Sequence, residues 1–104
     1  MSYVVIRWWG ESERQLPTNE FRTVLLEQRD ADGEHPSVSL EHGSGWALSY
    51  YGGKLIFENV EEDEVPWRRE DVSIDEVAEL WARLATGDVE AVRRAGPWLR
   101  GYNG

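Results

Sequence analysis

The stretch Ser37–Val60, with the sequence SVSLEHGSGWALSYYGGKLIFENV, carries the clearest pattern in this chain. Two glycine-marked turns, Gly43–Gly45 and Gly52–Gly53, divide it into three short segments rich in apolar residues. Glycine adopts the positive φ angles that tight hairpins need, and paired glycines between such segments are a strong hairpin signal. We therefore predict an antiparallel meander of three strands, over Ser37–Glu41, Trp46–Tyr51 and Lys54–Val60.

Upstream of the meander the pattern predicts one strand and one helix. Tyr3–Trp9 is β-branched and aromatic and is followed by Gly10, which is typical of a strand. Glu11–Pro17 is polar, so we expect a loop there. The apolar residues between Phe21 and Gln28 then follow at helical spacing, which favours a helix. A strand over Phe21–Leu26 is the competing interpretation.

Downstream of the meander, the charged and proline-containing stretch Glu61–Val72 is typical of a connection. Ser73 and Glu76 then form the S-x-x-E pattern of a capping box, and apolar residues repeat at helical spacing behind them until Gly87. A second short helix is expected over Val89–Arg94. The elements together predict an α+β fold: an antiparallel sheet of about four strands with two or three helices packed on one face. We expect a single domain over residues 1–104 with a frayed tail at 101–104.

Composition limits what such a domain can do. The chain has 104 residues, enough for one modest core, and its 11 basic and 20 acidic residues give a formal net charge of -9. That charge opposes binding to the phosphates of nucleic acids. The sequence contains no cysteine, which excludes disulfides and cysteine-ligated metal centres. Since it also has no membrane-length apolar run and no basic leader, we expect a cytoplasmic protein that binds no membrane.

The sequence carries no catalytic motif. Ser44 lies in HGSG rather than in a nucleophile elbow, and the glycines match no phosphate-binding loop. His35 and His42 are the only histidines, and their spacing from Glu41 does not define a metal site. We expect both histidines at the surface, and we expect a protein that is not an enzyme and uses no cofactor and no metal.

A run of acidic side chains is the sharpest electrostatic feature. It has two interpretations: a solvated connection, or a patch that docks on a basic surface and steers its approach. A patch of this kind could imitate the phosphates of a nucleic acid and block a cleft that handles them. The run consists of Glu58, Glu61, Glu62, Asp63 and Glu64.

Six tryptophans are more than one small core requires. Trp81 lies on the apolar stripe of its predicted helix, so we expect it in the core. Exposed tryptophans are enriched in binding hot spots, because they offer a large apolar area and one hydrogen-bond donor. Trp67, next to the acidic run, is the first candidate for a contact with a partner, and Trp46 is the second.

The order of these motifs resembles the small immunity proteins of bacterial polymorphic toxin systems, in particular the family often found beside deaminase-type toxins. The resemblance covers about sixty residues, from Ser37 to Trp98. It implies a protein without catalytic residues that acts by binding a cognate toxin. The matching features are the glycine-punctuated stretch SVSLEHGSGWALSYYGG, Val65–Pro66, the helix end LATG at Leu84–Gly87, and the late Trp98.

The resemblance and the charge together lead to one functional hypothesis. The protein is expected to neutralise a cognate toxin or effector, a basic domain, by covering its active cleft. The acidic run would steer and pair with the partner's basic residues, and Trp67 and Trp46 would supply buried contacts. The alternative is a small structural or regulatory domain that forms a homo-oligomer, or binds a constitutive partner, through its tryptophan-rich surface. A small-ligand or enzymatic domain is a third interpretation, for which the sequence offers no motif.

Overall fold

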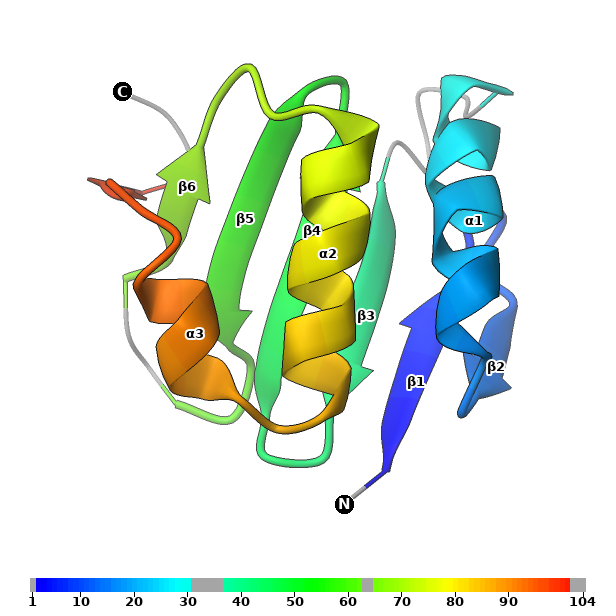
Figure 1. Ribbon diagram of the computed structural model, residues 1–104, viewed down its shortest axis with the longest axis horizontal. Coiled ribbons are helices and arrows are strands. Elements are labelled where there is room, and N and C mark those ends of the chain that lie inside the picture. Colours follow the sequence, from blue (N-terminus) through cyan, green and yellow to red (C-terminus); the bar gives the residue numbers. More distant parts are fainter. Residues whose placement is uncertain (1, 31–36, 63–64, 102–104) are drawn as a thin grey trace.

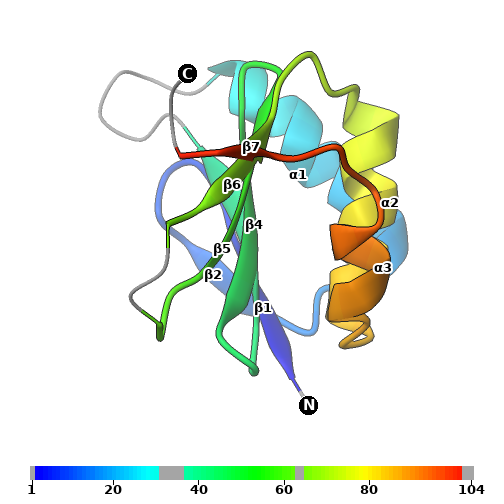
Figure 2. The same ribbon diagram turned by 90° about the vertical axis from the view of Figure 1, so that its left-hand side faces the viewer.

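A computed structural model of the chain describes residues 2–30, 37–62 and 65–101. It has an α+β fold, in which helices cover one face of an antiparallel sheet (Figures 1 and 2). The sheet has seven strands in the spatial order β2-β1-β3-β4-β5-β6-β7, and every neighbouring pair is antiparallel. The strands are β1 (Tyr3–Ile6), β2 (Ser12–Arg14), β3 (Val38–His42), β4 (Trp46–Tyr51), β5 (Lys54–Asn59), β6 (Trp67–Arg69) and β7 (Leu99–Arg100).

The predicted meander is confirmed as β3, β4 and β5, but the expected number of about four strands is wrong. The three additional strands are β2, β6 and β7, which are two or three residues long. Two of them lie inside stretches expected to be a loop and a connection. Strands this short and this polar carry almost no pattern of their own, and they form because a neighbouring strand offers its backbone groups for pairing.

The register of the strands separates two faces of the sheet. Leu48 of β4 pairs with Leu40 of β3 and with Phe57 of β5, and all three side chains are buried. On the neighbouring positions, Ser49 pairs with Ser39, and both are only half-buried. Because side chains alternate along a strand, the first row belongs to the core beneath the helices and the second row belongs to the face without helices.

The helical layer consists of α1 (Phe21–Glu27), α2 (Ile74–Ala85) and α3 (Val89–Arg93), with 3-10 turns at Thr18–Glu20 and Gln28–Asp30 on either side of α1. The helix expected after Pro17 is therefore confirmed, and the competing strand is not formed. Trp81 of α2 is completely buried, as predicted; its ring meets that of Phe21 edge-on at 5.6 Å and its indole N–H donates to the Leu48 carbonyl.

Local signals explain where α2 and α3 begin and end. The Ser73 hydroxyl accepts a hydrogen bond from the Glu76 backbone N–H, which confirms the predicted N-cap. Gly87 follows the end of α2 with a φ of +85°, the left-handed conformation in which glycine commonly terminates helices. The Asp88 carboxylate then accepts from the Ala91 N–H and caps α3.

The first strand is shorter than the sequence predicted. It ends at Ile6, so Trp8 and Trp9 lie in the turn before β2 rather than on opposite faces of a strand. Their rings contact each other edge-on at 5.5 Å, and Trp9 is 42% exposed. The strand stops because the chain must reverse over Gly10, whose φ is +93°, to pair β2 with β1.

At the other end of the chain, the Gly101 N–H donates to the Pro66 carbonyl at 2.8 Å. The expected frayed tail therefore begins with a hydrogen-bonded residue, and its remaining residues, 102–104, lie outside the described residues. Within the described ranges, the longest helix, α2, falls short of the length and apolar character that crossing a membrane requires.

Candidate functional site

Four aromatic rings and one arginine line a hollow of about 510 Å³ on the helix side of the sheet. They come from five separate places: the first residue of β4, the second half of β5, the first residue of β6, α3, and the segment between α3 and β7. A volume in this range is typical of sites that receive a small molecule or one large side chain. We call this feature the aromatic hollow; its residues are Trp46, Phe57, Trp67, Arg93 and Trp98.

The floor of the aromatic hollow belongs to the hydrophobic core. Phe57 is 1% exposed and Trp46 is 9% exposed, and their rings stack at 4.5 Å with an interplanar angle of 25°. Trp98 lies 5.4 Å from Phe57, and its indole N–H donates to the Val92 carbonyl at 3.1 Å. These contacts hold the rings in fixed positions, so the hollow is pre-formed.

Each tryptophan of the hollow has an arginine guanidinium over its ring. The negative face of an indole attracts a cation placed there, within about 6 Å of the ring centre. The three rings therefore already have a cation from the protein itself on one face. The pairs are Arg93 over Trp46 at 5.0 Å, Arg69 over Trp98 at 6.0 Å and Arg100 over Trp67 at 4.2 Å.

The three arginines differ in how far their charge is neutralised. Arg69 donates to the Ala95 carbonyl and pairs with Glu76 at 2.5 Å. Arg93, the charged residue in the lining, is 51% exposed in its side chain and pairs with Glu90 of its own helix at 3.0 Å. Among the described residues, Arg100 forms no ion pair within 4 Å. The lining of the hollow therefore includes the guanidinium of Arg93, and two further guanidinium groups lie over its tryptophan rings.

An acidic turn, formed by Glu61 and Glu62 directly after β5, lies beside the hollow. Both residues are exposed. The Glu61 N–H donates to the Asn59 side-chain carbonyl at 2.9 Å, and Asn59 is the register partner of Trp46. A Cβ atom at Gly45 would lie 2.6 Å from a Glu61 carboxylate oxygen, so Glu61 packs closely against the turn that leads into Trp46.

The structure thus brings Trp46, Trp67 and the acidic turn to one end of the sheet, and it does not bring Glu58 with them. Glu58 pairs with Ala47, and both alternate with residues of the helix-covered face, so the Glu58 side chain belongs to the opposite face. Asp63 and Glu64, the other two residues of the predicted acidic patch, lie outside the described residues.

Sequence patterns did not indicate the other three members of the hollow. Phe57 has the alternating pattern of a core residue, and Trp98 follows a Gly-Pro pair that suggests only the end of a helix. Arg93 lies in a helix of five residues whose position depends on tertiary packing. The register of the meander could have given one clue, since it sets Phe57 on the same face as Trp46 once the turn at Gly52–Gly53 is known.

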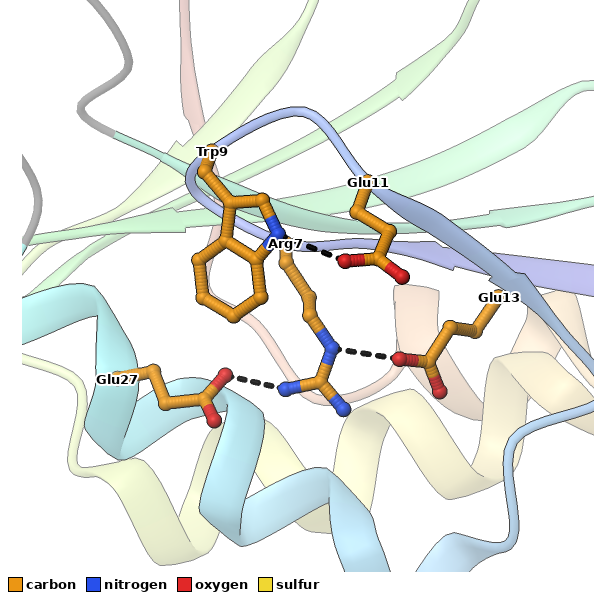
Figure 3. A network of polar contacts seen from close by, with 5 residues as sticks. All are labelled: Arg7, Trp9, Glu11, Glu13 and Glu27. Carbon is orange, nitrogen blue, oxygen red and sulfur yellow. Dashed lines mark hydrogen bonds and ion pairs between the residues drawn. The ribbon is translucent and has the colours of Figure 1, made fainter.

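A second arginine-and-tryptophan cluster, drawn in Figure 3, lies near β1 and β2, at the opposite edge of the sheet from β6 and β7. Arg7 donates to Glu13 of β2 at 2.7 Å and to Glu27 at the end of α1. The Trp9 indole N–H donates to Glu11 at 2.9 Å, and the Arg7 guanidinium lies 5.4 Å above the Trp9 ring. We call these five residues the Arg7 cluster.

In the Arg7 cluster the positive charge of Arg7 is paired with the carboxylates of Glu13 and Glu27. The hydrogen bond with Glu13, followed by that with Glu27, raises the pKa of Arg7 and outweighs the opposing effect of burial. The Arg7 side chain is 14% exposed, and the two carboxylates that it meets are about one-third exposed. Arg7 therefore connects β2 to α1, because both of its ion pairs are with residues of these two elements.

His42 is buried, which corrects the expectation that it lies at the surface; His35 lies outside the described residues. The inward alternation of Val38 and Leu40 continues along β3 to His42, which is 7% exposed. Its Nδ1 accepts from the Ser44 backbone N–H at 3.1 Å, and burial lowers the pKa of the imidazole. No group of three or more His, Asp or Glu side chains in residues 2–30, 37–62 and 65–101 is arranged to hold a metal ion.

Comparisons with protein-family models, with curated proteins and with solved structures found no match for this chain.

Proposed function

We propose that this protein is a non-enzymatic binding domain that neutralises a basic cognate toxin or effector by covering its active cleft. One observation carries the proposal: the exposed acidic turn packs against the backbone around Trp46, a lining residue of the pre-formed aromatic hollow. Carboxylates on a protruding turn attract basic side chains, and a concave aromatic surface holds one inserted group. The combination suits a partner that is basic around a projecting side chain.

The overall charge supports the same proposal. A net charge of -9 on 104 residues attracts a basic protein over distances longer than any contact and raises the association rate at low salt. The acidic turn concentrates part of this charge next to the start of β4, which supplies Trp46 to the hollow. The immunity proteins that the sequence resembles act by binding a cognate toxin. The concrete partner that we propose is a toxin with a nucleic-acid- or nucleotide-handling cleft in the cytoplasm.

The test begins with capture of the partner from a lysate of the native host at low salt. Immobilised wild-type protein is compared with E61K/E62K and with E20K/E79K, which changes the net charge equally at exposed sites on other elements, the 3-10 turn before α1 and helix α2. We expect the wild type and E20K/E79K to retain one stoichiometric basic protein, and E61K/E62K to lose it.

The captured partner is then purified, and its association rate and its activity are measured. Reversal of Glu61 and Glu62 should slow association about tenfold or more at low salt, with the difference shrinking as salt rises. One equivalent of wild-type protein should abolish the partner's activity. Equal association rates for the two charge-reversed variants would remove the acidic turn from the mechanism. A dimer of this chain with no second protein would favour the homo-oligomer instead.

A further inference from the structure

The arginines around the aromatic hollow decide which kind of group can enter it. We propose that the hollow binds one aromatic ring with a carboxylate next to it, and that it rejects cationic groups. The inference rests on the proposed function only in the source of that ring, which we take to be an aromatic side chain of the partner with a neighbouring carboxylate.

The aromatic part of this specificity follows from the lining. Four rings surround the hollow, and its floor, Trp46 on Phe57, is held at stacking distance by the core. An incoming planar ring can make aromatic contacts of the kind that these rings make with each other, which are stacked or tilted. A flexible aliphatic chain would fill the space without such contacts.

The rejection of cations follows from the guanidinium groups. Tryptophan faces are the groups that ordinarily attract lysine, arginine or alkylammonium ligands. In this hollow each of the three tryptophans already has an arginine over it, at 4.2 to 6.0 Å. A second cation would therefore meet like charge at every ring.

The preference for a carboxylate follows from Arg93. Arg93 is a lining residue, half of its side chain is exposed, and it pairs with Glu90 of the same short helix. Guanidinium groups have several donors in a planar fork, so Arg93 can keep Glu90 and still donate to a carboxylate in the hollow. Arg100, over Trp67, adds positive charge on the same side.

Three small probes test the inference without any partner. N-acetyl-tryptophan is an aromatic carboxylate, N-acetyl-tryptophanamide is its neutral equivalent, and tryptamine is the aromatic cation. Each is titrated into ¹⁵N-labelled protein, and the six tryptophan indole N–H signals are followed by NMR. We expect the signals of Trp46, Trp67 and Trp98 to shift, while those of Trp81 and Trp9, which donate to Leu48 and Glu11, stay in place.

The order of affinity is the decisive result. N-acetyl-tryptophan should bind about two- to fivefold more tightly than the neutral amide, the ratio expected of one exposed ion pair, and tryptamine should bind most weakly. R93Q should remove the difference between the acid and the amide. R94Q, a change of the neighbouring exposed arginine that lines no part of the hollow, should preserve it.

Three outcomes would overturn the inference: no probe shifts the hollow signals, tryptamine binds as well as the acid, or Trp81 and Trp9 shift along with the hollow. Because the titration contains no partner, its failure leaves the charge-reversal test of the proposed function intact. Conversely, a partner that ignores the acidic turn would not change the order of the three probes.

Discussion

The Arg7 cluster and the aromatic hollow each place an arginine over a tryptophan ring, but the two arginines differ in exposure and in their partners. Arg7 is 14% exposed and donates to carboxylates from two other elements, β2 and α1. Arg93 is 51% exposed and pairs with a residue three positions away on its own helix. Both guanidinium groups lie 5.0 to 5.4 Å above a tryptophan ring.

The two regions differ in how far apart along the chain the arginine and its ion-pair partners lie. In the Arg7 cluster the ion pairs connect distant parts of the chain, so they stabilise the fold and leave little capacity for a ligand. In the hollow the arginine is held locally, and the fold does not depend on it. A cation above a tryptophan therefore indicates a binding surface only where the cation keeps free donors and the ring borders a cavity.

The largest expected effect on stability comes from the floor of the aromatic hollow, because its residues are also part of the hydrophobic core. Phe57→Ala removes the 1%-exposed ring between Trp46 and Trp98 and should lower the free energy of unfolding by about 3–5 kcal/mol, since it leaves a cavity under the hollow. Trp9→Ala, in the Arg7 cluster, should cost less than about 1 kcal/mol because that ring lies at the surface. Urea denaturation measures both, and a Phe57→Ala loss under 1 kcal/mol would contradict the description of the floor.

The same substitution in the two arginines tests the comparison directly. Arg7→Met should lower the free energy of unfolding by about 2 kcal/mol, less than for a fully buried pair because Glu13 and Glu27 can rehydrate. Arg93→Met should cost below about 0.5 kcal/mol, as exposed ion pairs contribute little. A double-mutant cycle of Arg7→Met with Glu27→Gln checks the cause. Equal losses of unfolding free energy for Arg7→Met and Arg93→Met would show that the two arginines do not differ in their contribution to stability.

Glycines next to each region give a smaller effect. A Cβ at Gly96 would lie 2.8 Å from the backbone N and a ring carbon of Trp98, so Gly96→Ala should displace that ring and cost about 1 kcal/mol. The indole N–H signal of Trp98 should shift as its bond to Val92 changes. Gly10→Ala meets open space, although its φ of +93° brings strain, and it should leave the Trp98 signal unchanged. A stationary Trp98 signal in Gly96→Ala would show that the ring is not held there.

The smallest expected effect is a pH dependence of stability that comes from His42, a buried residue outside both regions. Burial lowers the pKa of His42 in the folded protein below its ordinary value of 6.5, so the unfolded chain binds more protons at acidic pH. Stability is therefore full above pH 6.5, falls as the pH drops below it, and levels off once the folded pKa is passed. His42→Gln should flatten this profile in urea denaturations at a series of pH values. A profile unchanged by His42→Gln would assign the dependence to other groups.

The sequence predicted the parts of the fold in which local and tertiary preferences agree. The meander and α2 have their own turn glycines, alternation and caps, so their bounds follow closely from the pattern. β6 is the contrasting case: its residues, Trp67–Arg69, sit in a charged and proline-containing stretch. It is a strand because β5 and β7 pair with it on either side, and no local signal carries that information.

The candidate site was predictable only in part for the same reason. The excess of tryptophans singled out Trp67 and Trp46, and both line the hollow. Phe57, Arg93 and Trp98 join them from elements whose meeting depends on the complete sheet. The Arg7 cluster gave no signal at all, because Glu13 and Glu27 are two among 20 acidic residues and only the fold selects them.

The place of β1 between β2 and β3 has a consequence for how the protein folds and opens. Tyr3 pairs with His42, so docking β1 onto β3 closes a loop that includes α1, whereas the turns of the meander span two or three residues. Loop closure of that length is entropically costly and slows the search for the pairing. The meander is therefore expected to form first and to exchange its amide protons last, and the β2-β1-α1 edge is expected to detach as one unit in partial unfolding.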